Sequence, residues 1–219
     1  GPNGSGKSTT IKMLLGLLHP TQGRIAVLGR SPRDVGMKAR IGYLPEESHL
    51  YPFLTARETL QFYGRMFDLS RPERDARTGQ LLDMVGLTQT RTRTVGEFSK
   101  GMQRRIGLAQ ALINDPDLVI LDEPTAVLTP QEADALFNML RRLRDEGKSV
   151  ILVTHKLREI MAITDRVTVM RQGVIVGEVA TATTSPRELA EKMVGRAVLL
   201  RVEKKLAQPG AHKVNAQNM

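Results

Sequence analysis

Residues 1–8 read GPNGSGKS and fit the pattern G-x-x-x-x-G-K-[ST], which decides the fold. Its glycines carry no side chain, so the backbone can turn tightly and point successive N–H groups at phosphate oxygens. Lys7 reaches the outer phosphates, and Ser8 is the expected magnesium ligand. A glycine-rich turn without a ligand is a poor alternative, since chance gives such a match in well under about 1% of chains this long. The residues expected to bind the phosphates are Gly1, Pro2, Asn3, Gly4, Ser5, Gly6, Lys7, Ser8 and Thr9.

A loop of this kind follows a buried strand and precedes a helix whose dipole favours the phosphate. The helix is predicted over residues 8–18, where Ile11, Leu14 and Leu18 recur at helical spacing and Pro20 follows. The strand does not precede the loop in this sequence, which also begins without methionine. We therefore expect a fragment that lacks its N-terminal strands, with a gap in the sheet where the central strand belongs.

Length and composition favour one globular domain with a helical insertion, since the chain has 219 residues and is 41% hydrophobic. The absence of cysteine excludes disulfides, zinc–cysteine clusters and thiol nucleophiles, and it favours a cytosolic location. The apolar runs at residues 13–18 and 149–153 are far shorter than the roughly 20 residues that cross a bilayer. We expect no membrane-spanning segment and no signal peptide.

The net charge of +9 raises the possibility of a nucleic-acid or acidic-lipid partner. The arginines, however, are spread along the chain with acidic residues between them, and aromatic residues make up only 4%. Stacking platforms for single strands are therefore scarce. A solvated basic surface is the favoured interpretation, and contact with lipid or nucleic acid is the alternative.

The N-terminal half predicts two short strands, at residues 24–28 and 40–44, separated by a turn-like segment. From Thr55 the pattern becomes helical, and Thr55 with Glu58 forms a capping box. The helical periodicity continues without strands, so we expect a helical subdomain at about residues 50–112.

Two later strands carry chemistry at their ends. Residues 117–121, DLVIL, are apolar enough for a parallel strand covered on both faces, and they lead directly to Asp122 and Glu123. Residues 149–153 form the next predicted strand, which leads to His155. Ligands bind at the carboxyl ends of such strands, so these side chains are candidates for a site.

The remaining C-terminal elements are predicted from turn and capping signals. Residues 166–170 and 174–179 form an antiparallel pair around a Gln-Gly turn. Helices begin after Thr129 and Ser185, each followed by proline and, three positions on, by glutamate. Residues 197–219 are expected to be a linker or mobile tail because they are polar and lack periodicity.

Five motifs in this order resemble those of the ATP-binding cassette (ABC) ATPases, the motor subunits of ABC transporters. They are GPNGSGKS at 1–8, YLPE at 43–46, FSKGMQRR at 98–105, LVILDEPT at 118–125, and the strand that ends in His155. The resemblance covers residues 1–196, expected to be an ABC ATPase domain. It implies an α/β P-loop NTPase with a mainly parallel sheet, flanking helices, an inserted helical subdomain and an antiparallel edge.

The resemblance also assigns roles, with ATP and Mg²⁺ as cofactors. Lys7, Glu123 and His155 are the expected catalytic residues: Glu123 polarises the attacking water and His155 senses the γ-phosphate. Ser8, Asp122 and Glu46 are the expected metal contacts, although Glu46 stands where the family has glutamine. Without the other motifs, an acidic pair capping a strand and an ordinary strand-end histidine would be the simpler interpretations.

FSKGMQRR resembles the family signature LSGGQ and keeps Ser99 and Gly101 at the N-terminus of a helix, a natural anion site. In the family, this element faces the γ-phosphate bound by the opposite subunit, so Ser99 and Gly101 are expected nucleotide contacts. Two further departures are Thr129, where the family has the D-loop aspartate, and the missing aromatic that stacks on adenine. The preference for adenine therefore comes from the resemblance alone.

The two halves resemble different branches of the family. YLPE and FSKGM resemble ATPases of drug, lipid or polysaccharide exporters, whereas residues 123–137 and 154–178 resemble sugar and nucleoside importers, whose chains often carry two cassettes. We expect a subunit that binds and hydrolyses ATP to power transport, with sugar or nucleoside import favoured and export the alternative. An assembly from two sources would explain the conflict equally well.

The expected partners are integral-membrane permease subunits and a second ABC ATPase domain, as a homodimer, a heterodimer or a tandem chain. No nucleic-acid partner is expected, and the protein would lie peripherally on the cytoplasmic face of the membrane. Two alternatives stay open: a soluble ABC protein acting on ribosomes or DNA, and a fragment that binds ATP weakly or not at all. The transported substrate is not encoded in this chain.

Overall fold

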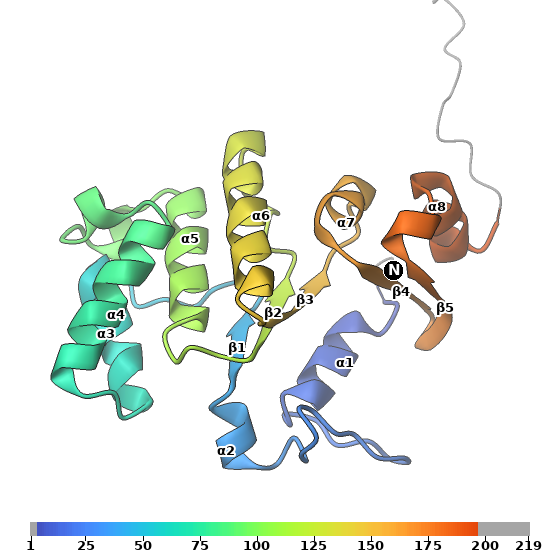
Figure 1. The fold of residues 1–219 in the computed structure, drawn as a ribbon, viewed down its shortest axis with the longest axis horizontal. Coiled ribbons are helices and arrows are strands. Elements are labelled where there is room, and N and C mark those ends of the chain that lie inside the picture. The colour runs from blue at the N-terminus through green and yellow to red at the C-terminus, as the bar shows by residue number, and fades with distance from the viewer. Residues whose placement is uncertain (1–3, 197–219) are drawn as a thin grey trace, which may run out of the picture.

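The computed structural model describes residues 4–196, in which helices pack on both faces of a small parallel sheet (Figure 1). Gly1, Pro2, Asn3 and the predicted tail at 197–219 lie outside the described residues. The helices are α1 (Lys7–Leu14), α2 (Val35–Lys38), α3 (Ala56–Met66), α4 (Arg71–Met84), α5 (Lys100–Ala111), α6 (Pro130–Asp145), α7 (Leu157–Ile163) and α8 (Pro186–Val194). The strands are β1 (Ile41–Leu44), β2 (Leu118–Asp122), β3 (Ser149–Val153), β4 (Arg166–Arg171) and β5 (Val174–Ala180).

Strands β1, β2 and β3 form a parallel sheet in that order, and β2 lies in its centre. All five residues of β2 are buried, and its four apolar side chains enter two hydrophobic clusters alternately. Val119 and Leu121 pack with residues of α5 and α6, whereas Leu118 and Ile120 pack with Ile11 of α1. Helices α1 and α5 therefore cover opposite faces of the sheet, as the apolar DLVIL run predicts.

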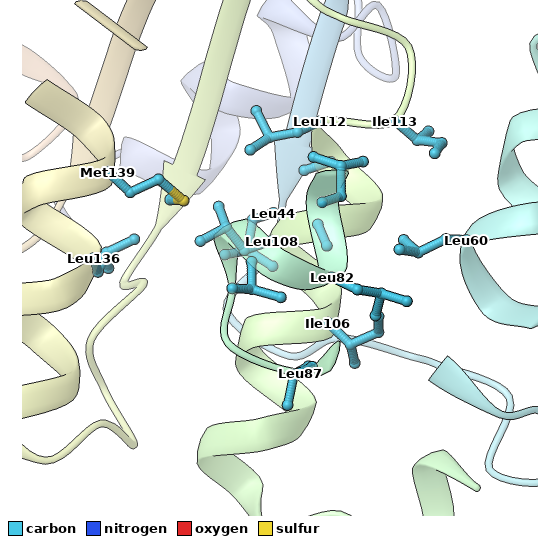
Figure 2. Close-up of a cluster of buried hydrophobic side chains, with 14 of the residues drawn as sticks. Leu44, Leu60, Leu82, Leu87, Ile106, Leu108, Leu112, Ile113, Leu136 and Met139 are labelled. Atoms are coloured by element: carbon cyan, nitrogen blue, oxygen red, sulfur yellow. The ribbon is translucent and has the colours of Figure 1, made fainter. Parts of the chain in front are cut away.

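Helices α3 and α4 pack on α5 beside the sheet. The predicted capping box is confirmed at the start of α3: Thr55 Oγ1 accepts from the Glu58 N–H, and Glu58 accepts from the Thr55 N–H. Figure 2 shows side chains of the three helices meeting in one cluster, among them Leu60, Leu82 and Ile106, all of them buried. This cluster continues to Leu44 of β1, so the helical region and the sheet share one core.

Strands β4 and β5 form the predicted antiparallel hairpin. Its turn residues, Gln172 and Gly173, both have left-handed backbones (φ 51° and 78°), as a two-residue hairpin turn of type I′ requires. Helix α8 then begins after Ser185, whose hydroxyl accepts from the Glu188 N–H. It ends at Val194, and Gly195 caps it with a left-handed backbone (φ 81°).

A cavity of about 830 Å³ separates the parallel sheet from the hairpin. It is lined by β3 and β4 and by residues of α1, α7 and α8. Within residues 4–196, β3 pairs only with β2, and its Ile151 is 37% exposed although the strand is apolar. The described chain therefore contains an interrupted sheet, which agrees with the predicted gap.

Two local predictions are wrong. The strand expected at residues 24–28 is absent, and only an isolated bridge joins Val27 to Arg30, because no described strand lies beside it to complete a sheet. The first helix ends at Leu14 rather than at residue 18. Gly16 turns the chain there with a φ of 69°, and a Cβ at this position would lie 2.3 Å from the Pro32 carbonyl oxygen.

Candidate functional site

The described part of the phosphate loop has the backbone that its glycines predict. Gly4 and Gly6 are left-handed, with φ values of 75° and 95°, and α1 begins immediately afterwards at Lys7. The first turn of α1 holds no acidic residue. The N–H groups at the N-terminus of a helix and the helix dipole therefore favour an anion at this end.

The hairpin turn supports this loop from one side. The Gly173 N–H donates to the Ser5 carbonyl at 3.1 Å, and Ser5 is buried. A Cβ on Gly6 would lie 3.2 Å from the Gly173 Cα. Both the left-handed backbone and this close approach therefore favour glycine at position 6.

Asp122 lies at the carboxyl end of β2 and is 8% exposed. Burial raises the pKa of its carboxyl above the ordinary 3.8, and the negative charges of Glu46 and Glu123 raise it further. The positive charges of Lys7 and Arg104 act in the opposite direction on the same pKa. The fold thus brings Lys7, Glu46, Asp122 and Glu123 within electrostatic reach of one another, although they come from three separate motifs.

Glu123 and His155 are in direct contact, with 2.8 Å between Oε1 and Nδ1. Glu123 has a left-handed backbone (φ 46°), and its N–H donates to the Val153 carbonyl at 2.8 Å, which ties the ends of β2 and β3 together. Its second carboxylate oxygen, Oε2, is buried and has no hydrogen-bond partner within residues 4–196. The sequence predicts both residues as catalytic, but it does not predict their contact.

Arg104 is a site residue that the sequence analysis missed. Its guanidinium is buried and donates to four carbonyls: Pro45, Glu46 at 3.0 Å, Asp122, and Pro124 at 3.2 Å. It therefore joins the loop after β1 to the loop after β2. Its spacing in the sequence could have indicated burial, because Arg104 shares the buried face of α5 with Gly101, Leu108 and Ala111.

The signature residues lie away from the phosphate loop in this chain. Ser99 is exposed and caps α5 by accepting from the Met102 N–H at 3.2 Å. Gly101 is buried against α6, where a Cβ would lie 2.9 Å from Glu132 Oε1. Helices α5 and α1 pack on opposite faces of the sheet, and the residue of α5 whose charge acts on the pKa of Asp122 is Arg104.

The expected metal contacts are only partly assembled. Glu46 and Asp122 interact electrostatically, and Ser8 is exposed in the first turn of α1. Within residues 4–196, no three His, Cys, Asp or Glu side chains are grouped so that they could hold a metal ion by themselves. In the same part of the chain, every helix is too short or too polar to cross a membrane.

Comparison with known proteins places these features in a family. The family model described as "ABC transporter" matches residues 1–126. The glucose import ATP-binding protein TsgD13 of Haloferax volcanii is 38% identical over 255 aligned residues, which cover 100% of this chain and 46% of that protein. The Nod factor export ATP-binding protein I of Burkholderia lata is 40% identical over 197 residues, which cover 89% of this chain and 63% of that protein. The chain thus spans about half to two thirds of the length of these relatives.

Solved structures share the fold. A structure described as the ATP-binding subunit of an ABC transporter matches with a TM-score of 0.79 at 29% identity, and the match covers 89% of this chain and 85% of that chain. The dimeric ATP-binding cassette MJ0796, in a post-hydrolysis state with ADP and Pi, has a TM-score of 0.75 at 27% identity, with 83% of both chains covered. The predicted P-loop NTPase fold is therefore confirmed. A family match over more than half of the chain, relatives of about 40% identity and neighbours of the same fold show that this chain belongs to the ABC transporter ATP-binding proteins.

Proposed function

We propose that the protein hydrolyses ATP and uses the energy to drive solute transport through a membrane permease. One observation carries the hydrolytic part of this proposal. Glu123 has a buried carboxylate with one oxygen bonded to His155 and the other without a hydrogen-bond partner among residues 4–196, and it lies beside Asp122 in the same electrostatic cluster as Lys7. A carboxylate with one oxygen fixed and one available is suited to accept a hydrogen bond from an attacking water.

The loop and the start of α1 are the proposed phosphate-binding elements. The left-handed Gly4 and Gly6 free backbone N–H groups for phosphate oxygens, and Lys7 supplies a positive charge at the same end of the helix. Ser8 and Thr9 are exposed in the first turn, where their hydroxyls are open to a ligand. Gly1, Pro2 and Asn3 complete the predicted loop outside the described residues.

The residues present fit a magnesium ion that arrives with the nucleotide. Mg²⁺ is usually held by one or two carboxylates or hydroxyls, with phosphates and waters completing its shell, so a three-residue protein cluster is not required. Burial raises the pKa of Asp122, the negative charges of Glu46 and Glu123 raise it further, and a cation at this place would offset the unfavourable charge. Ser8, Asp122 and Glu46 are the proposed contacts. The ion would neutralise charge on the phosphate oxygens during transfer.

Glu123 and His155 act on the attacking water and the γ-phosphate. Glu123 orients and polarises the water, and the bond from His155 to Oε1 restrains the carboxylate. The His155 side chain is 59% exposed, so its second ring nitrogen is open to a phosphate oxygen. Catalysis of this kind depends mainly on positioning and charge stabilisation.

We also propose that a second ABC ATPase domain completes the site. Ser99 and Gly101 lie at the start of α5, which packs on the opposite face of the sheet from α1, and this position supports a contact with a nucleotide on another domain. The solved neighbour described as a dimer with ADP and Pi supports this arrangement. The second domain is another copy, a related subunit or a later part of the same chain.

Sugar or nucleoside import is the favoured transport function. The relative named for glucose import is similar over the whole of this chain, including the segment with importer-like motifs. Export is the second candidate, since the relative named for Nod factor export is equally similar over 89% of the chain. Through a permease, the domain would lie at the cytoplasmic face of the membrane. Uptake of labelled glucose and of a labelled nucleoside by cells with and without the gene separates these functions, because an exporter would change the uptake of neither.

The hydrolytic proposal is tested with Glu123→Gln in the full-length protein. The substitution keeps the shape of the side chain but removes its charge, so ATP binding is retained and turnover falls by about 100- to 10,000-fold. Glu178→Gln is a matched control, because Glu178 is exposed on the hairpin and pairs only with Arg166 among the described residues. Turnover by Glu123→Gln within tenfold of the wild type would refute the assignment.

A further inference from the structure

Glu159 is a buried carboxylate that the proposed mechanism does not use. It lies in the first turn of α7 and is 6% exposed. Thr125 Oγ1 donates to its Oε1, Thr154 Oγ1 donates to its Oε2 at 3.0 Å, and Lys156 Nζ lies 3.2 Å from Oε1. A buried carboxylate is unfavourable unless it is paired and hydrogen-bonded, and here both oxygens are satisfied.

The two threonine hydroxyls are each held from both sides. Thr125 Oγ1 accepts from Lys156 Nζ at 3.0 Å, and Thr154 Oγ1 accepts from the Lys156 N–H at 3.1 Å. Lys156 Nζ also donates to the Thr125 carbonyl at 3.1 Å. Every hydroxyl therefore donates once and accepts once. A network satisfied in this way favours a single arrangement of its members.

The position of this network gives it a role. Thr125 lies two residues after Glu123, and Thr154 lies immediately before His155. One carboxylate therefore links the loop after β2 to the loop after β3, and these loops carry the Glu123–His155 contact of 2.8 Å. The backbone bond from Glu123 to Val153 joins the same two loops at the strand ends.

We propose that Glu159 is a positioning residue for ATP hydrolysis: it sets the separation of the two loops, so that His155 can hold Glu123 against the attacking water. This inference rests on the proposed function. A displacement of about 1 Å at a reacting group lowers rates by about 100-fold. The phosphate loop and α1 belong to a separate segment, so loss of Glu159 should reduce the rate of hydrolysis and not the affinity for ATP.

The first test compares two substitutions of Glu159 in the full-length protein by single-turnover hydrolysis of labelled ATP with Mg²⁺. Glu159→Ala leaves both threonine hydroxyls without an acceptor, and we expect the rate to fall by about 10- to 100-fold with the Kd for ATP within about twofold. Glu159→Gln should lose less and stay within about fivefold of the wild type, because its amide oxygen still accepts from one threonine and its side chain keeps the size of glutamate. Glu191→Ala removes an exposed helical ion pair with Arg187 and serves as the matched control.

The second test is a double-mutant cycle with His155→Ala. If Glu159 acts through the Glu123–His155 pair, Glu159→Ala will lower the rate of His155→Ala by less than about twofold. A merely structural role would give a different result. The double variant would lose the product of the two single rate losses, Glu159→Ala and Glu159→Gln would lose the same rate, or ATP binding would be lost. Each of these results overturns the inference. So does a wild-type rate in Glu159→Ala. If the wild type hydrolyses ATP and Glu123→Gln does not, such a result leaves the proposed function standing. A wild type without turnover overturns both.

Discussion

Substitution of Arg104 by methionine should destabilise the protein more than any surface substitution, because it removes a buried connection between two loops. The guanidinium donates to the carbonyls of Pro45, Glu46, Asp122 and Pro124. Methionine is of similar length and fills most of the same path without a donor. The four carbonyls would keep their place beside the site but lose their partner.

The magnitude follows from two opposing terms. Hydrogen bonds from a charged group contribute about 1.5–3 kcal/mol each, so four of them contribute roughly 6–12 kcal/mol before desolvation is counted. Burial of the guanidinium opposes this by several kcal/mol. The same burial lowers the pKa of Arg104, although Asp122 and Glu46 act to raise it. We expect a net loss of about 3–5 kcal/mol in the free energy of unfolding. For a domain of this size, that corresponds to a fall of roughly 6–20 °C in Tm.

Urea unfolding followed by circular dichroism, with the full-length protein free of ATP, measures this loss. Arg57→Met is the matched control, because Arg57 is 53% exposed and its pair with Asp75 is on the surface. The control should change the free energy of unfolding by less than about 0.5 kcal/mol. A loss below about 1 kcal/mol for Arg104→Met would show that the four carbonyls are satisfied in another way, and the reasoning would be wrong.

Substitutions at four further positions test other parts of the structure. The pKa of Asp122 is raised above 3.8, so its ionisation destabilises the fold at neutral pH. Asp122→Asn should therefore raise the Tm of the ATP-free protein at pH 7.5. The gain in Tm should shrink as the pH falls through the raised pKa toward 3.8. A variant with a lower Tm than the wild type at pH 7.5 would contradict this. Thr55→Ala should lower the free energy of unfolding in urea by about 1 kcal/mol, because the α3 cap is lost, whereas Thr55→Ser should keep it. Gly6→Ala forces a left-handed alanine next to Gly173 and should destabilise the protein by about 1–2 kcal/mol and weaken ATP binding in a calorimetric titration. Gly79→Ala in α4 meets no atom within 4 Å and should instead stabilise the protein by about 0.5–1 kcal/mol, so equal effects of the two would rule out the strain argument.

The features that the sequence predicts well are local. The capping boxes at Thr55 and Thr129 depend on residues three positions apart, and both form in the structure. The buried strand β2 follows from an apolar run of strand length, and its last residue places Asp122 at the sheet edge. Glu123 and His155 are predictable as candidate site residues for the same reason, since Glu123 directly follows β2 and His155 lies two residues after the end of β3.

The features that the sequence does not predict depend on packing between distant segments. Arg104 is one of many arginines in the sequence, and its role appears only when the loops after β1 and β2 meet around it. The role of Glu159 likewise becomes visible only through its contacts with Thr125, in the loop after β2, and Thr154, in the loop after β3. The wrong prediction of a strand at residues 24–28 has the same cause, because a strand forms only beside a partner strand. The bounds of the helical subdomain at residues 50–112 stay a prediction.

The central claim is that Lys7 and its loop hold a triphosphate beside Asp122 and Glu123. A crystal structure of the full-length Glu123→Gln protein with ATP and Mg²⁺ tests it most directly. The account predicts Lys7 Nζ at about 3 Å from a β- or γ-phosphate oxygen, with the side chain at position 123 one water away from the γ-phosphate. A nucleotide bound elsewhere, or a γ-phosphate more than about 15 Å from Asp122, would contradict the account, since the electrostatic interaction is negligible at that distance.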